Sequence, residues 1–298
     1  FDLDLNLMRG IAEQGFQYCT PIQAEVLEHT LAGADAIGRA QTGTGKTAAF
    51  LITVINDLLK HPIDVQRFAG EPRALIVAPT RELAMQIEKD AKVLAKHTDL
   101  QVMSVVGGMN FNRQQERLQN KLIDILVATP GRLLDFAKRR DLWLDRVEFL
   151  VLDEADRMLD MGFEETLNKI VDWLPAKRQT LLFSATYPDA IESMAKRVLR
   201  DPAMVKVDSS HDEQTIPQHF YRVDSNEQRR EALRLLLLEQ QPESAVVFCN
   251  TRQEVKTVDE QLRGWGFSVL ALHGDLEQRE RDEMLVRFAN KSTTVLVA

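Results

Sequence analysis

Short apolar runs recur along this chain of 298 residues, and each is followed by polar residues and then by an amphipathic segment. Continuous apolar runs are typical of strands that are covered on both faces, as in a parallel sheet. The segments between them carry apolar residues at helical spacing. This alternation predicts an α/β fold with parallel sheets. The runs cover residues 74–80, 124–130, 149–155, 180–186, 245–251, 268–274 and 293–298.

One polar segment interrupts the alternation. Residues 207–217 have no apolar period and end in Pro217, so we expect a linker there. The first domain would then span 1–206 and the second 218–298. The second domain has few apolar runs, and the last of them stops at Ala298. We therefore expect the chain to be truncated inside its second domain.

Composition limits the class of protein. The hydrophobic fraction of 44% is enough for real cores, and no apolar run is as long as a membrane span. The chain opens without a basic and apolar leader, and Cys19 and Cys249 lack a CxxC partner, so we expect a cytoplasmic protein with no membrane contact and no zinc site. Because the net charge is −8, any nucleic-acid site must be built from specific residues.

A glycine-rich stretch at 40–47, AQTGTGKT, predicts a phosphate-binding loop. Gly43 and Gly45 allow a tight turn whose N–H groups point at an anion, Lys46 adds a charge, and Thr47 places a hydroxyl where Mg²⁺ binds. The common pattern has glycine where this chain has Ala40, and a plain glycine-rich turn before a helix is the alternative.

Acidic residues follow the apolar run at 149–152 directly. Mg²⁺ between the β- and γ-phosphates needs a carboxylate from a second strand end, and Asp153 would supply it. Glu154 would then orient or deprotonate an attacking water. An acidic helix N-terminus is the alternative for the acids alone. Together with the glycine-rich loop they predict Mg²⁺-dependent hydrolysis of ATP or GTP.

Further motifs occur in a fixed order: PTRELA at 79–84, TPGR at 129–132, DEAD at 153–156 and SAT at 184–186. GFQYCTPIQ at 15–23, GG at 107–108, VVFCNTR at 246–252, HGD at 273–275 and QRER at 278–281 join them. The set resembles the DEAD-box family of ATP-dependent RNA helicases along the whole chain. The resemblance implies two RecA-like P-loop domains that close on ATP and RNA.

The resemblance also implies roles for individual residues. ATP and its Mg²⁺ would be held by Thr20, Gln23, Ala40, Gln41, Thr42, Gly43, Thr44, Gly45, Lys46 and Thr47, with Asp153 as a second metal ligand and Glu154, Lys46 and Asp153 as catalytic residues. Asp156, Ser184 and Thr186 would couple hydrolysis to closure. RNA would be gripped through its backbone by Pro79, Thr80, Arg81, Gly108, Thr129, Gly131 and Arg132, and from the second domain by Arg252, Gln278 and Arg281.

The two lobes resemble different types of bacterial helicase within the family. The first lobe looks most like the bacterial helicase of the RNA-degradation machinery, and the second more like the bacterial helicase that acts on large-subunit ribosomal RNA. Proteins of RNA decay or ribosome assembly are therefore the expected partners.

The family motifs that follow the run at 293–298 are absent, so we expect weak hydrolysis by this chain. A DNA translocase and an ATP-gated RNA clamp are the rival functions.

Overall fold

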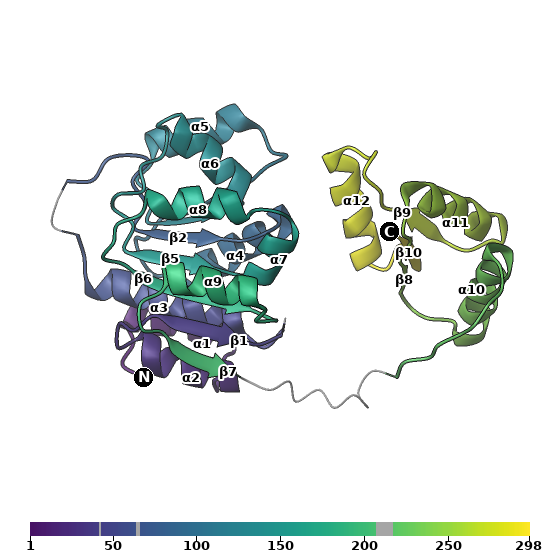
Figure 1. The fold of residues 1–298 in the computed structure, drawn as a ribbon, viewed down its shortest axis with the longest axis horizontal. Helices are drawn as coiled ribbons and strands as arrows, with labels where there is room; N and C mark the ends of the chain where they lie inside the picture. Colours follow the sequence, from purple (N-terminus) through teal and green to yellow (C-terminus); the bar gives the residue numbers. More distant parts are fainter. Residues whose placement is uncertain (42, 64–65, 207–216) are drawn as a thin grey trace. The chain divides into compact units, whose positions relative to one another are not determined.

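The computed structural model describes residues 1–41, 43–63, 66–206 and 217–298, and it divides the chain into two compact units (Figure 1). The first unit is Phe1–Asp212 and the second is Glu213–Ala298. The expected linker at 207–217 lies outside the described residues except for Pro217. Each unit is built around its own parallel sheet, as the alternating sequence predicts.

The first unit contains a seven-stranded sheet in the order β3-β4-β2-β5-β6-β1-β7. Every neighbouring pair is parallel, so the carboxyl ends of all these strands lie at one edge. The apolar runs that predicted β2, β4, β5 and β6 are confirmed. The strands are β1 (Ala36–Arg39), β2 (Ala74–Val77), β3 (Val102–Val105), β4 (Ile125–Ala128), β5 (Phe149–Leu152), β6 (Gln179–Ser184) and β7 (Ala203–Lys206).

Helices cover both faces of this sheet (Figure 1). One face packs against α1 (Leu5–Glu13), α2 (Pro21–Thr30), α3 (Lys46–Lys60) and α4 (Arg81–Leu94). The other face packs against α5 (Phe111–Asn120), α6 (Pro130–Lys138), α7 (Ala155–Asp160), α8 (Glu164–Asp172) and α9 (Asp189–Val198). Successive strand residues therefore enter opposite cores, which explains why the runs are apolar throughout.

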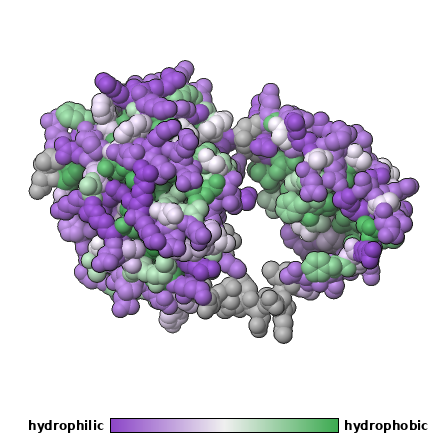
Figure 2. Space-filling model, in the orientation of Figure 1, coloured by the Kyte–Doolittle hydropathy of each residue, from purple (hydrophilic) through white to green (hydrophobic). Residues whose placement is uncertain are grey.

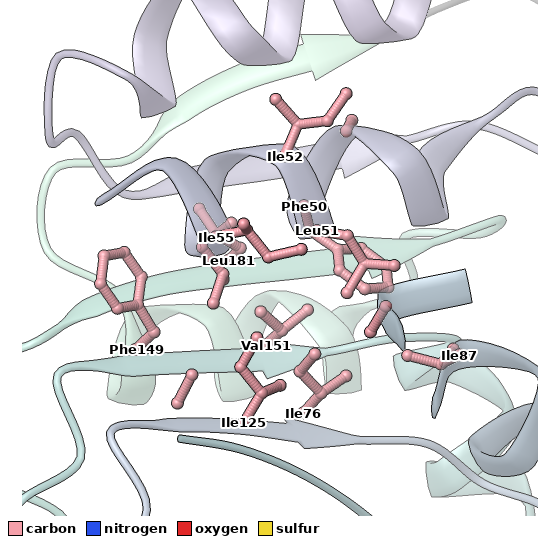
Figure 3. Close-up of a cluster of buried hydrophobic side chains, with 14 of the residues drawn as sticks. Phe50, Leu51, Ile52, Ile55, Ile76, Ile87, Ile125, Phe149, Val151 and Leu181 are labelled. Carbon is pink, nitrogen blue, oxygen red and sulfur yellow. The ribbon is translucent and has the colours of Figure 1, made fainter. Parts of the chain in front are cut away.

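Helix α3 is buried along most of its length because it lies between the sheet and other helices. Figure 3 shows Phe50, Leu51 and Ile55 of α3 beside Val151 and Leu181 of the sheet. Burial on this scale fixes the helix firmly, since each large apolar side chain contributes about 1.5–3 kcal/mol. The loop that precedes α3 is therefore attached to a rigid element.

The second unit has a three-stranded parallel sheet in the order β8-β10-β9. Its strands are β8 (Ala245–Val247), β9 (Val269–Ala271) and β10 (Val295–Val297), and its helices are α10 (Asn226–Gln240), α11 (Arg252–Gly264) and α12 (Gln278–Ala289). All three strands fall in predicted runs. Apolar side chains reach the surface of this unit (Figure 2), and Phe220 and Phe248 are 91% and 85% exposed.

Membrane crossing can be judged from the helices. In the described ranges of the chain, none of them combines the length and the apolar character that a membrane span requires.

Candidate active site

The predicted site residues of the first unit follow different strands but share one edge of its sheet. The glycine-rich loop follows β1, Thr80 follows β2, Thr129 follows β4 and Asp153 follows β5. Because all the strands are parallel, these loops meet at the carboxyl edge, where ligands bind in open α/β sheets.

The glycine-rich loop closes around the side chain of Lys46. Gly43 and Gly45 have φ angles of +82° and +91°, which glycine adopts without strain. Lys46 begins α3, is only 6% exposed, and its Nζ donates to the carbonyl of Ala40 over 2.7 Å. Thr44 Oγ1 donates to the carbonyl of Gln41 over 2.8 Å. The cation is thus held inside the loop, at the N-terminus of a buried helix. Thr42, also predicted to contact ATP, lies outside the described residues.

Thr20 and Gln23 bind this loop from α2. Thr20 Oγ1 donates to the carbonyl of Thr44 over 2.8 Å, and Gln23 Nε2 donates to the carbonyl of Gly45 over 3.1 Å. Gln23 Oε1 accepts from the N–H of Thr20 over 2.9 Å, which completes a capping box. A Cβ on Gly45 would lie 2.5 Å from Gln23 Nε2 and would displace this amide, and the φ angle of +91° would strain any residue other than glycine there. Contact of Gln23 with adenine stays a prediction, whereas its contact with the loop is observed.

The first two acids of the DEAD motif, Asp153 and Glu154, differ in burial and in backbone conformation. Asp153 is 3% exposed, and one oxygen accepts from the N–H of Glu154 over 3.0 Å. Burial raises the pKa of Asp153 to about 6, against the opposing effect of the nearby Lys46 charge. Glu154 has a left-handed backbone with φ of +50° at the N-cap of α7. Such a conformation costs about 1–3 kcal/mol in a residue other than glycine and is common at functional sites.

The donor set fits a magnesium ion. The buried carboxylate of Asp153 and the hydroxyl of Thr47 are hard oxygen donors, which Mg²⁺ prefers. In the described part of the chain, no three His, Cys, Asp or Glu side chains converge as metal ligands. An ion held here would complete its coordination with phosphate oxygens and water, as is usual for Mg²⁺.

Asp156 connects the acidic loop to the end of β6. It accepts from the N–H and Oγ1 of Thr186 over 2.9 and 2.8 Å, and its own N–H donates to Oγ of Ser184 over 3.3 Å. Burial raises the pKa of Asp156, but these hydrogen bonds outweigh it and leave the pKa below its ordinary value. The predicted bonding of these three residues is therefore present, while their role in coupling is untested.

The loops predicted to grip RNA are joined to one another. The N–H of Gly107 donates to Thr129 Oγ1 over 3.3 Å, and both guanidinium NH groups of Arg132 donate to the carbonyl of Met109 over 3.3 Å. These contacts arise because β3 and β4 are neighbours. Gly108, φ +74°, turns the chain here.

The other RNA-grip candidates of the first unit lie at the same edge. Thr80 caps α4 by accepting from the N–H of Leu83 over 3.3 Å, Arg81 is the first residue of α4, Pro79 is buried, and Gly131 is exposed in the first turn of α6.

Sequence reasoning missed two residues that shape this region. Gln114 is 5% exposed and makes two bonds to the backbone of Val106, with distances of 2.8 and 3.2 Å. Phe111 stacks on Phe136 with ring centroids 4.5 Å apart. The sequence signal that could have indicated them is their position, because Phe111 and Gln114 follow shortly after the glycine pair at 107–108.

The second unit carries the predicted RNA-binding residues Arg252, Gln278 and Arg281. Arg252 begins α11 and pairs with Asp275, which also accepts from Lys256 Nζ over 3.0 Å. Hydrogen bonds from Lys256 and Arg252 lower the pKa of Asp275. One NH of Arg281 donates to the carbonyl of His273 over 3.5 Å. The side chain of Gln278, also predicted to bind RNA, lies outside what the structure describes.

Comparison with protein families gives two matches. The family model described as DEAD/DEAH box helicase matches residues 20–194, and that described as helicase conserved C-terminal domain matches residues 228–298.

Individual proteins are similar over the whole chain. The ATP-dependent RNA helicase RhlB of Pseudomonas aeruginosa is 50% identical over 301 residues, which cover 100% of this chain and 76% of that protein. The ATP-dependent RNA helicase DbpA of Escherichia coli is 44% identical over 292 residues, which cover 98% of this chain and 62% of that protein.

Solved structures are similar as well. S. cerevisiae Dbp5 L327V bound to RNA and ADP BeF3 has a TM-score of 0.82 at 29% identity, covering 99% of this chain and 73% of that one. A DEAD box protein from Methanococcus jannaschii has a TM-score of 0.63 at 34% identity, covering 100% of this chain and 78% of that one. These neighbours contain two RecA-like domains, which confirms the predicted fold class.

Proposed function

This chain belongs to the DEAD/DEAH box helicase family, and we propose that it couples RNA-stimulated hydrolysis of Mg²⁺-ATP to the local opening of short RNA duplexes. Membership makes it an ATPase of the ATP-dependent RNA helicase type. One observation carries the proposal further: the phosphate loop, the acids and the loops at 79–81, 107–108 and 129–132 share one edge of a rigid sheet.

The phosphate side of the proposal depends on Lys46, Asp153 and Glu154. Lys46 would exchange the carbonyl of Ala40 for phosphate oxygens, an exchange that its buried position at a helix N-terminus favours. Asp153 and Thr47 would hold Mg²⁺, which supplies charge stabilisation to the phosphates when bound. Glu154 would orient or deprotonate the attacking water.

The RNA side depends on backbone contacts. The main-chain N–H groups of Thr80, Arg81 and Gly108 and the side chain of Arg132 would donate to phosphate oxygens. Such contacts fix the position of a strand and carry no sequence information, so binding would be largely independent of sequence. Contacts to the 2′-hydroxyl would select RNA over DNA.

The coupling depends on Asp156. This residue follows Glu154 by two positions and bonds to Ser184 and Thr186 at the end of β6. A shift of the acidic loop on phosphate release would therefore be transmitted to the SAT segment. We propose the same division of the chain as above, with domains at 1–206 and 218–298 and a linker at 207–217, and a cytoplasmic role in RNA decay or ribosome assembly.

The first experiment measures ATP hydrolysis by the full-length protein with no nucleic acid, with single-stranded RNA and with single-stranded DNA. The Glu154→Gln protein serves as the blank. Stimulation by RNA alone supports the proposal. Equal stimulation by DNA would favour a DNA translocase instead. RNA stimulation and tight ATP-dependent RNA binding without strand separation, measured on a short fluorescent duplex, would favour an RNA clamp.

A further inference from the structure

The ring of Phe111 lies where two arginines and a second aromatic ring meet. It stacks on Phe136 with ring centroids 4.5 Å apart and an interplanar angle of 22°. The Cζ atom of Arg132 lies 5.3 Å from the centre of this ring and 5.9 Å from that of Phe136. The Cζ atom of Arg139 lies 4.7 Å from the Phe111 centre. Guanidinium groups at such distances are attracted by the ring quadrupole.

The surroundings of Arg132 make this ring important for the orientation of its side chain. Its two NH groups share one acceptor, the carbonyl of Met109, at 3.3 Å each, which is beyond the usual N–H···O distance. In the described ranges, no carboxylate oxygen comes within 4.0 Å of its guanidinium. A long arginine side chain held only by a weak hydrogen bond would sample many rotamers. The contact with the stacked rings restricts it further.

The fold fixes the position of both rings of the stacked pair. Phe136 is fully buried in the core beneath α6, and Phe111 is the first residue of α5, directly after the loop that contains Gly107, Gly108 and Met109. The ring and the carbonyl that hold Arg132 are therefore both fixed by the chain around the start of α5. Arg132 itself belongs to α6, so two helices must keep their relative position for the guanidinium to be aligned.

From this geometry we propose that Phe111 is a positioning residue for RNA binding: it holds the guanidinium of Arg132 in the orientation that meets an RNA phosphate. The ring acts through Arg132 and does not touch RNA. Among the described residues, the arrangement leaves the positive charge without a carboxylate partner. It also restricts the side chain before RNA arrives, which reduces the entropy lost on binding. The inference rests on the proposed function, because it assumes that Arg132 binds RNA.

The test uses conservative substitutions in the full-length protein. Phe111→Leu keeps an apolar side chain on Phe136 but removes the aromatic face, whereas Phe111→Tyr keeps the face. We expect Phe111→Leu to raise the RNA concentration for half-maximal ATPase stimulation about three- to tenfold. The rate at saturating RNA and the KM for ATP should not change, and Phe111→Tyr should behave as wild type. Phe68→Leu is the matched control, because Phe68 is exposed and precedes β2, at the opposite edge of the sheet.

A double-mutant cycle separates positioning from a general loss of structure. If Phe111 acts through Arg132, then Phe111→Leu should have no further effect on RNA affinity in an Arg132→Gln background. An equal effect in both backgrounds, an unchanged RNA affinity in Phe111→Leu, or a loss in Phe111→Tyr as large as that in Phe111→Leu would overturn the inference. The proposed function fails separately, through a wild-type protein that RNA does not stimulate.

Discussion

Replacement of Asp153 by Asn should stabilise the nucleotide-free protein while it abolishes Mg²⁺-dependent nucleotide binding. Burial raises the pKa of Asp153 from 3.8 to about 6. The folded protein therefore keeps a proton that the unfolded chain releases between these two pH values. Wild-type stability falls as the pH rises through this window, and the full cost of the ionised, buried carboxylate is present above it. Asparagine has no charge and avoids this cost at every pH.

The magnitude follows from the same pKa. One pKa unit corresponds to about 1.36 kcal/mol, so the ionised Asp153 lowers the free energy of unfolding by about 3 kcal/mol at pH 8. At pH 5 the unfolded carboxylate is already mostly ionised while the folded one is mostly protonated, and the cost is only about half of that at pH 8. The stability advantage of Asp153→Asn over wild type should therefore grow by about 1–2 kcal/mol between pH 5 and pH 8. This growth is independent of any constant effect of the amide side chain.

Urea unfolding of the nucleotide-free protein in EDTA measures this difference. Trp143 and Trp173 lie in the first unit, and Trp265 lies in the second. A Trp265→Phe background leaves the two tryptophans of the first unit as reporters of its unfolding. Asp156→Asn is the matched control. The pKa of Asp156 is lowered, so its ionised carboxylate stabilises the folded protein above the unfolded pKa, whereas that of Asp153 destabilises it. This stabilisation is lost only as the pH falls through the folded pKa, so Asp156→Asn should be less stable than wild type at both pH values.

If the stability difference between Asp153→Asn and wild type is the same at pH 5 and pH 8, then the buried carboxylate does not titrate as proposed. If the stability advantage of Asp153→Asn over wild type instead shrinks between pH 5 and pH 8, the charge of Lys46 outweighs burial and the pKa direction is wrong.

Three further substitutions test other parts of the site and fold. Glu154→Gln should lower ATP turnover by ~10²–10⁴-fold with ATP binding retained, and wild-type turnover would exclude its role as the base. Lys46→Ala should weaken nucleotide affinity in a direct binding titration, and unchanged affinity would refute the phosphate loop. Glu148→Gln removes the charge that pairs with the 4% exposed Arg73 and should lower the free energy of unfolding by about 1–3 kcal/mol; urea curves identical to wild type would show that the backbone acceptors suffice.

The sequence alone determined the elements whose residue pattern is local. The apolar runs of β2, β4, β5 and β6 could be predicted because strands buried on both faces need apolar side chains at every position. The phosphate loop and the acids could be found because their chemistry needs particular residue types at short spacing. Three strands were missed, β1, β3 and β7. β1 contains Gly38 and ends in Arg39, and β7 ends in Lys206, so neither presents a long apolar run.

Contacts between distant segments were decided by the tertiary structure. That Gly107 bonds to Thr129 depends on β3 lying beside β4, and the strand order is not written in the residues of either strand. The raised pKa of Asp153 needs the burial that the sheet and its helices create together. The ring of Phe111 meets Arg132 only because α5 packs next to α6. Sequence pattern thus specifies which groups the chain offers for chemistry, and the packing of strands and helices specifies which of them meet, because pattern reflects local burial and contacts depend on the whole fold.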